Sequence, residues 1–194
     1  MNWIERLFVR AKHWQIFLLF VAVFAIGHFP IIGNFIAALK PPEGAAVTLL
    51  LAEIATVPAT WCFLLWLWSL GSFLSALVPP ELRLKKRFFL LATLYLAIYA
   101  PVSIGLLQII DPEIFIATLP LPFVALFCFF YSLYFVGKNL AMAETGKPAT
   151  YFDWAGPAAL LWFCLIGVWF IQPRINRLYA EKRNTGAAPE ATAI

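Results

Sequence analysis

The distribution of charged residues constrains the fold of this chain more than any other feature. Each of five stretches without Asp, Glu, Lys or Arg has at least about 20 residues, the length of an α-helix that crosses a hydrocarbon core about 30 Å thick. The chain is 63% hydrophobic and 12% charged, too apolar for an ordinary soluble domain. It is therefore expected to be an integral membrane protein. The stretches are residues 14–39, 54–80, 88–110, 114–137 and 154–173.

The apolar stretches predict helices, because they lack the alternation of polar and apolar residues that membrane barrel strands require. We expect an all-α, polytopic membrane protein with one helical domain over residues 1–183 and a disordered tail over 184–194. Four transmembrane helices and a fifth apolar segment are expected at about residues 14–38, 50–78, 88–110, 121–143 and 155–172.

Prolines set several of the expected helix limits, since proline has no backbone N–H and restricts the residue before it. Pro30 predicts a kink or an early end of the first helix, near His28. Pro101 predicts a kink in the middle of the third helix that neighbouring helices have to accommodate. Pro120 and Pro122 suit a first turn, so the fourth helix is expected to begin there.

The fifth apolar segment carries two conflicting signals. Thr150 with Asp153 predicts the start of a helix that leads into it, and its length favours a full crossing. Gly167 and the basic residues beyond Pro173 favour a re-entrant hairpin instead, because translocating positive charge opposes the usual orientation bias. We expect the hairpin, followed by a short amphipathic surface helix over 173–183 that begins with Pro173.

Basic residues indicate the orientation in the membrane. They cluster at 81–87, whereas the expected interfacial loop over 111–120 contains none. Because cytoplasmic loops carry an excess of Lys and Arg, the N-terminus and residues 81–87 are expected in the cytoplasm and 111–120 on the opposite side. The net charge is +4, but the basic clusters flank apolar segments, which is typical of orientation against anionic lipid. Nucleic acid is not an expected partner.

Catalytic and metal-binding motifs are missing from the sequence. It has two histidines, His13 and His28, and no CxxC, HExxH or GxSxG pattern. Its cysteines, Cys62, Cys128 and Cys164, lie inside apolar segments and are expected to be small buried hydrophobic residues. No metal site, cofactor or catalytic residue is therefore predicted, and an intramembrane enzyme ranks last among the candidate functions.

A candidate polar site remains. Glu53 lies in the N-terminal part of the second expected helix, and an ionisable group at membrane depth is costly and commonly functional. With His28, Asn34, Tyr131 and Tyr134 it forms a candidate intramembrane or interfacial site. In the simpler alternative, Glu53 lies in the headgroup layer.

Gly71 and Ser75 form a small-xxx-small pattern that favours close helix packing. The chain also has 19 Phe and 8 Trp, which can line a site for a lipophilic ligand but are more typical of lipid-facing belts and packing.

Three segments resemble known sequences: FYSLYFVGKNLAMAETGKPATYFDW, LLWFCLIGVWFIQPRIN and, near the start, RAKHWQIFLL. They are similar to a group of small bacterial multi-pass membrane proteins that are uncharacterised and have no assigned activity. The resemblance is clearest over residues 130–176. It implies a location in the bacterial inner membrane and implies no site residues.

Two functions are compatible with these observations. The leading hypothesis is a non-enzymatic accessory or scaffold subunit that contacts the lipid bilayer and another membrane protein or a second copy of itself. The alternative is a small transporter or binder of a lipophilic ligand, with Glu53 and His28 in a polar intramembrane site.

Overall fold

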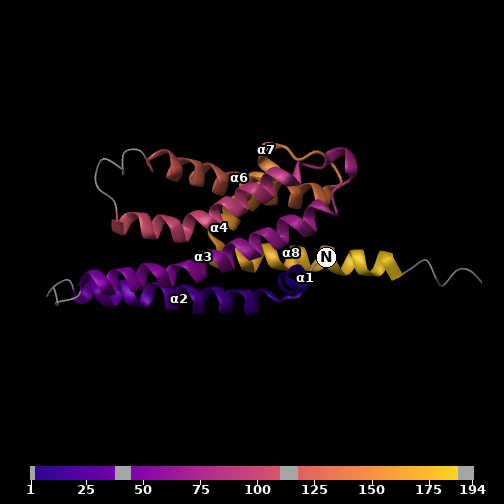
Figure 1. The fold of residues 1–194 in the computed structure, drawn as a ribbon. Helices are drawn as coiled ribbons and strands as arrows, with labels where there is room; N and C mark the ends of the chain where they lie inside the picture. Colours follow the sequence, from indigo (N-terminus) through magenta and orange to yellow (C-terminus); the bar gives the residue numbers. More distant parts are fainter. Residues whose placement is uncertain (1–2, 38–44, 110–117, 188–194) are drawn as a thin grey trace, which may run out of the picture. The chain divides into compact units, whose positions relative to one another are not determined.

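The computed structural model describes residues 3–37, 45–109 and 118–187, and in these ranges the chain is all-helical, without strands (Figure 1). The short helix η1 (Pro80–Leu82) links two of the long helices. The α-helices are α1 (Trp3–Arg10), α2 (His13–Ala37), α3 (Ala45–Ser75), α4 (Lys86–Ile109), α6 (Pro120–Thr145), α7 (Tyr151–Trp162) and α8 (Cys164–Ala187).

Helices α2, α3, α4 and α6 lie on the first four apolar segments, with limits close to those expected from the sequence. Helix α6 begins with Pro120 and Pro122 in its first turn, as the sequence predicts. Within the described residues, two helices are long and apolar enough to cross a membrane, Thr56–Ser75 of α3 and the whole of α6.

Prolines do not end these helices. A kink or an early end of the first helix was predicted near Pro30; the early end is wrong, since α2 continues to Ala37. In apolar surroundings a helix satisfies its other backbone groups internally, so the loss of one hydrogen bond is tolerated. Pro101 shows how: its missing N–H leaves the carbonyl of Ala97 without a helical partner, and Trp61 Nε1 of α3 donates to that oxygen at 2.9 Å.

The chain divides into two compact units, each of which contains segments from several helices. Unit 1 comprises Met1–Phe17, Trp66–Lys86 and Leu133–Ile194, and unit 2 comprises Leu18–Leu65 and Arg87–Ser132. Along the chain, α2 and α4 lead from unit 1 into unit 2, and α3 and α6 lead back into unit 1.

The core of unit 1 consists of large apolar side chains from the end of α3, the second half of α6 and one face of α8. Helix α1 is amphipathic: it buries Phe8 and Val9 and exposes Arg6 and Arg10. Its buried side lies against α8. The largest fully buried side chains of the core include Trp66, Leu70, Phe135, Leu140, Met142, Leu161 and Ile171.

Unit 2 is packed mainly through aromatic rings. Phe63 contacts Phe20 and Phe129, with ring centroids 6.4 and 6.2 Å apart. Tyr95 of α4 donates a hydrogen bond to the Leu121 carbonyl of α6 at 3.0 Å. Many large apolar side chains of this unit are nevertheless exposed, including Leu91, Leu94, Ile98 and Val102 on α4 and Phe123, Val124, Leu126 and Phe127 on α6.

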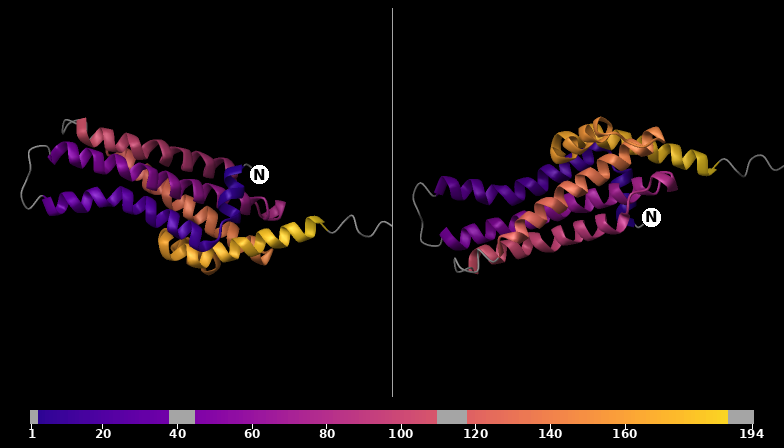
Figure 2. Two further views of the ribbon diagram at one scale, coloured as in Figure 1. Left: turned by 90° about the horizontal axis from the view of Figure 1, so that it is seen from below. Right: turned by 90° about the horizontal axis from the view of Figure 1, so that it is seen from above.

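Helices α7 and α8 form a tight helical hairpin within unit 1 (Figure 2). The helix breaks at Phe163, whose N–H still bonds to the Ala159 carbonyl, and not at Gly167 as expected. Gly167 has a different role: a Cβ there would overlap the carbonyl oxygen of Leu160. Glycine therefore lets the first turn of α8 approach the last turn of α7.

The C-terminal end of the chain differs from two further expectations. Helix α8 runs without interruption from Cys164 through Pro173, so no separate helix begins at Pro173. The same helix includes residues 184–187, which were expected to belong to the disordered tail; residues 188–194 lie outside the described residues. Helix α8 packs against α1 and α7, and such tertiary contacts allow a helix to continue through a proline.

The ends of α6 and α7 are fixed by local sequence. Gly146, with φ of 65°, follows α6 in the left-handed region, and its N–H bonds to the Met142 carbonyl at 2.9 Å. The predicted helix start at Thr150 is confirmed. Thr150 donates to Asp153 Oδ2 through its backbone N (2.7 Å) and its Oγ1 (2.6 Å), in a capping box.

Candidate functional site

Two sets of polar contacts in unit 1 involve α8. Gln172 is completely buried. Its Nε2 donates to the carbonyl oxygens of Phe8 at 2.8 Å and Ala11 at 3.0 Å, and its Oε1 accepts from Trp66 Nε1 at 3.3 Å. One side-chain amide thus joins α8 to α1 and α3.

These hydrogen bonds satisfy carbonyl groups at the end of α1, because the last carbonyls of a helix have no partner within it. Asn176, one turn after Gln172, adds a second amide: its Nδ2 donates to the Ala11 carbonyl at 3.3 Å and its Oδ1 accepts from Gln172 Nε2 at 3.3 Å. The two amides therefore act as a cap for α1 that is supplied by another helix.

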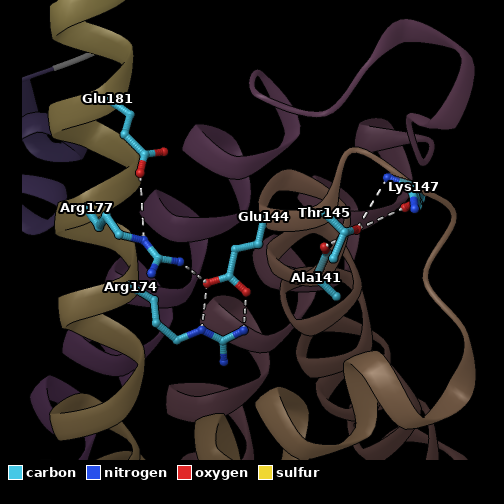
Figure 3. A network of polar contacts seen from close by, with 7 residues as sticks. All are labelled: Ala141, Glu144, Thr145, Lys147, Arg174, Arg177 and Glu181. Atoms are coloured by element: carbon cyan, nitrogen blue, oxygen red, sulfur yellow. Dashed lines mark hydrogen bonds and ion pairs between the residues drawn. The ribbon is translucent and has the colours of Figure 1, made fainter.

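A charged cluster includes two arginines of α8, Arg174 and Arg177 (Figure 3). Arg174 binds Glu144, near the end of α6, through two nitrogens: Nε donates to Oε1 at 2.7 Å and Nη2 pairs with Oε2. Arg177 Nη2 lies 3.4 Å from Glu144 Oε1, and its Nε lies 3.8 Å from Glu181 Oε1. The side chain of Glu144 is 15% exposed. Its carboxylate forms a bidentate ion pair with Arg174, which is stronger than a contact through one oxygen.

A third polar group lies between α6 and α7. Lys138 Nζ donates to the Tyr134 hydroxyl at 2.9 Å and lies 5.2 Å from the centre of that ring. The Tyr134 ring meets Trp154 edge-on at 4.8 Å, and Trp154 in turn contacts Tyr151 at 5.1 Å. Gly137 permits this approach, because a Cβ there would lie 3.0 Å from the Trp154 carbonyl oxygen.

Three buried hydroxyl groups of the described core are engaged with backbone, whereas the buried Ser72 Oγ has no hydrogen-bond partner. The buried side chains of Ser75, Thr93 and Ser132 each donate to a carbonyl of their own helix, at 3.0, 3.0 and 2.7 Å. A nucleophile needs a neighbouring base, and these contacts supply none. In the part of the chain that the structure describes, no group of three or more His, Cys, Asp or Glu side chains is placed to hold a metal ion.

The structure describes only part of the polar site that was predicted from the sequence. His28 and Asn34 lie in α2 and Glu53 in α3, and their side chains lie outside the described residues. Tyr131 belongs to unit 2, where its ring meets Phe88 edge-on at 4.6 Å and stacks on Phe127. Tyr134 belongs to unit 1. The two tyrosines therefore have different partners.

The other expected positions lie in the interior. Gly71 and Ser75 are both buried on α3 within unit 1, where small side chains favour close packing. His13 is half-buried and packs on Trp169 of α8, with ring centroids 4.8 Å apart. Cys128 and Cys164 are buried, and Cys62 is half-buried.

Sequence reasoning missed Gln172 and Glu144 as site residues. A glutamine that directly precedes a proline at the end of an apolar run is a weak signal of a buried amide. Glu144 has no local signal, because its partner Arg174 lies thirty positions further along the chain. Comparisons with protein-family models, with curated proteins and with solved structures find no match, so the chemistry of the site is the available indication of its function.

Proposed function

We propose that this chain is a multi-pass protein of the bacterial inner membrane that acts as a non-enzymatic accessory or scaffold subunit. In this proposal α2, α3, α4 and α6 cross the bilayer, and α7 with α8 forms a re-entrant hairpin. Both chain ends then lie on the cytoplasmic side. The observation that carries the proposal is that α8 contacts Phe8, which precedes α2, and Glu144, which lies in the last turn of α6.

The hairpin topology is supported by two contacts. Glu144 precedes the hairpin and Arg174 lies in its second helix, yet the two side chains form an ion pair. Gln172 also binds the carbonyl of Phe8, which precedes α2. A fifth crossing would separate Glu144 from Arg174 by the thickness of the bilayer, about 30 Å.

The length and surface of the hairpin agree with a partial insertion. Helix α7 has 12 residues, or about 18 Å, which is too short to cross a 30 Å core. The turn and the adjoining part of α8 expose large apolar side chains, Phe163 to 62%. The outer face of α8 becomes polar beyond Pro173. The turn is therefore the part of the hairpin that lies deepest in lipid.

Lysines and arginines support the orientation. All of them except Lys40 and Arg87 belong to unit 1, which also contains the two chain ends. By the positive-inside rule this unit faces the cytoplasm. The resemblance of residues 130–176 to bacterial multi-pass proteins agrees with the inner membrane.

A scaffold function is supported by how the polar groups are used. Glu144 is neutralised by two arginines and Gln172 is engaged through both of its amide atoms, so these groups hold helices together. The buried hydroxyls of Ser75, Thr93 and Ser132 donate to carbonyls of their own helices. The exposed apolar row on α4, Leu91, Leu94, Ile98 and Val102, is the surface through which we expect contact with another membrane protein or a second copy.

The topology is tested by fusing to Ile194 a reporter that is active only outside the cytoplasm. We expect no signal from this fusion and a strong signal from one placed in 111–117. Paired cysteines, Glu144→Cys with Arg174→Cys, should form a crosslink in membranes. An active reporter at Ile194 would contradict the hairpin.

The scaffold function is tested with a photo-crosslinking residue at Leu94, which is exposed on α4. We expect one discrete protein adduct from membranes, and none when the probe replaces the exposed Phe152 of α7. Adducts with lipid alone at both positions would contradict a scaffold and favour the alternative, a transporter or binder of a lipophilic ligand.

A further inference from the structure

Lys138 is a half-buried cation whose surroundings differ from those of Arg174 and Arg177 in the same unit. Arg174 and Arg177 pair with Glu144. Lys138 donates to the Tyr134 hydroxyl, and no ion pair joins it to an Asp or Glu of the described residues. An ammonium group has three N–H donors, so Lys138 can donate a hydrogen bond to a ligand oxygen in addition to the one it donates to Tyr134.

Aromatic side chains lie close to this ammonium. The Tyr134 ring stands perpendicular to Trp154, with centroids 4.8 Å apart, and Trp154 meets Tyr151 at an interplanar angle of 78°. The close approach of α7 at Gly137 keeps these rings together. Tyrosine and tryptophan with a basic residue are typical of the membrane–water interface, where an apolar ring and a polar tip are both solvated.

The start of α7 has the same interfacial character. Tyr151 is 64% and Phe152 is 89% exposed, directly beside the charged Asp153. A large aromatic side chain that is almost fully exposed next to a carboxylate indicates a level where headgroups meet acyl chains. Lys138 lies about two turns before the end of α6, and its neighbour Gly137 packs against Trp154, so Lys138 lies beside the start of α7.

We propose that Lys138, Tyr134 and Trp154 form a binding site for the phosphate and glycerol of an anionic phospholipid in the cytoplasmic leaflet, a proposal that rests on the membrane topology given above. The ammonium of Lys138 neutralises and hydrogen-bonds the phosphate. The Tyr134 hydroxyl orients the ammonium. The rings of Trp154 and Tyr151 contact the glycerol and the first carbons of an acyl chain.

The site is tested by native mass spectrometry of the full chain with phosphatidylglycerol or phosphatidylcholine. We expect one phosphatidylglycerol to be retained more strongly than phosphatidylcholine. Lys138→Gln should weaken phosphatidylglycerol binding about tenfold, the usual effect of losing one charge-assisted contact. The matched control is Lys147→Gln, since Lys147 is an exposed lysine of the same unit; it should bind like the wild type.

Further variants separate the possible outcomes. Lys138→Arg keeps the charge and should retain most of the binding, which excludes a folding defect as the cause of the loss in Lys138→Gln. Millimolar inorganic phosphate should not displace the lipid; displacement would identify a soluble anion as the ligand and overturn the proposal. Equal retention of both lipids, or unchanged binding by Lys138→Gln, would also overturn it. A failed topology would appear separately, as an active reporter at Ile194.

Discussion

Units 1 and 2 both use a side chain to satisfy a backbone carbonyl that its own helix leaves without a partner, but the carbonyls arise differently. In unit 1 the amide of Gln172 binds the carbonyls at the end of α1. In unit 2 the indole of Trp61 binds the Ala97 carbonyl that Pro101 leaves free. Unit 1 adds the ion pairs of Glu144, and unit 2 adds aromatic packing.

This difference follows from the solvent expected around each unit. Apolar side chains gain little by leaving lipid, so helices in the bilayer are joined by close packing and a few hydrogen bonds. Charged side chains are tolerated where water and headgroups solvate them. The basic unit 1 can therefore use ion pairs, whereas the described contacts of unit 2 are hydrogen bonds and aromatic packing. Single substitutions at those contacts are expected to have larger effects in unit 1.

The largest effect is expected for Gly167→Ala, in the α7–α8 hairpin of unit 1. The new methyl group would overlap the Leu160 carbonyl oxygen, and backbone on both sides has to move. We expect a loss of about 3 kcal/mol in the free energy of unfolding, measured by unfolding with SDS in mixed micelles. Gly156→Ala is the matched control, because nothing lies within 4 Å of the new methyl group; it should change stability by less than about 1 kcal/mol. Equal effects would contradict the tight hairpin.

Gln172→Leu ranks second. It removes the donor to the Phe8 carbonyl, one of the two donors to the Ala11 carbonyl and the acceptor of the Trp66 Nε1 hydrogen bond, at a cost of about 2 kcal/mol. Because α1 loses its cap, its backbone amides should exchange with deuterium faster, while those of α4 keep their rate. Unchanged exchange in α1 would show that apolar packing of Phe8 and Val9 alone holds this helix.

Trp61→Phe is the corresponding test in unit 2. It removes the donor to the Ala97 carbonyl, and we expect a loss of about 1 kcal/mol because the side chain of Trp61 is 46% exposed. Pro101→Ala restores an N–H to α4. In the double variant the helix can therefore satisfy Ala97 itself, and the loss should be smaller than in Trp61→Phe alone. Additive effects in this double-mutant cycle would refute the compensation of Pro101 by Trp61.

Features that depend on neighbours in the sequence were predictable. Charge-free runs indicated the helices, Pro120 and Pro122 set the start of α6, and Thr150 with Asp153 marked the start of α7. Each of these signals acts within one or two helical turns, so the sequence order alone contains the information.

Features that depend on tertiary contacts were not predictable. The glycine at position 167 suggested a break at that residue, whereas it serves the close approach of two helices that meet at Phe163. The pairing of Glu144 with Arg174 and of Gln172 with Phe8 joins distant positions. A single sequence does not reveal which of many polar residues will meet after folding.

The smallest effect is expected at the capping box of α7, because the two side chains that form it, Thr150 and Asp153, are both exposed. Hydrogen bonds from the Thr150 side chain and backbone lower the pKa of Asp153 below its ordinary value. A carboxyl whose pKa is lowered in the folded state contributes stability above its unfolded pKa of about 4, and loses that contribution as the pH falls through the folded value. Amide exchange at residues 151–154 should therefore become faster than intrinsic chemistry predicts only below about pH 4. Asp153→Asn should remove this acid-dependent step, while Thr150→Val, which keeps the backbone N–H bond to Asp153, should reduce it. An acid-dependent step that persists in Asp153→Asn would assign the titration to another carboxyl group.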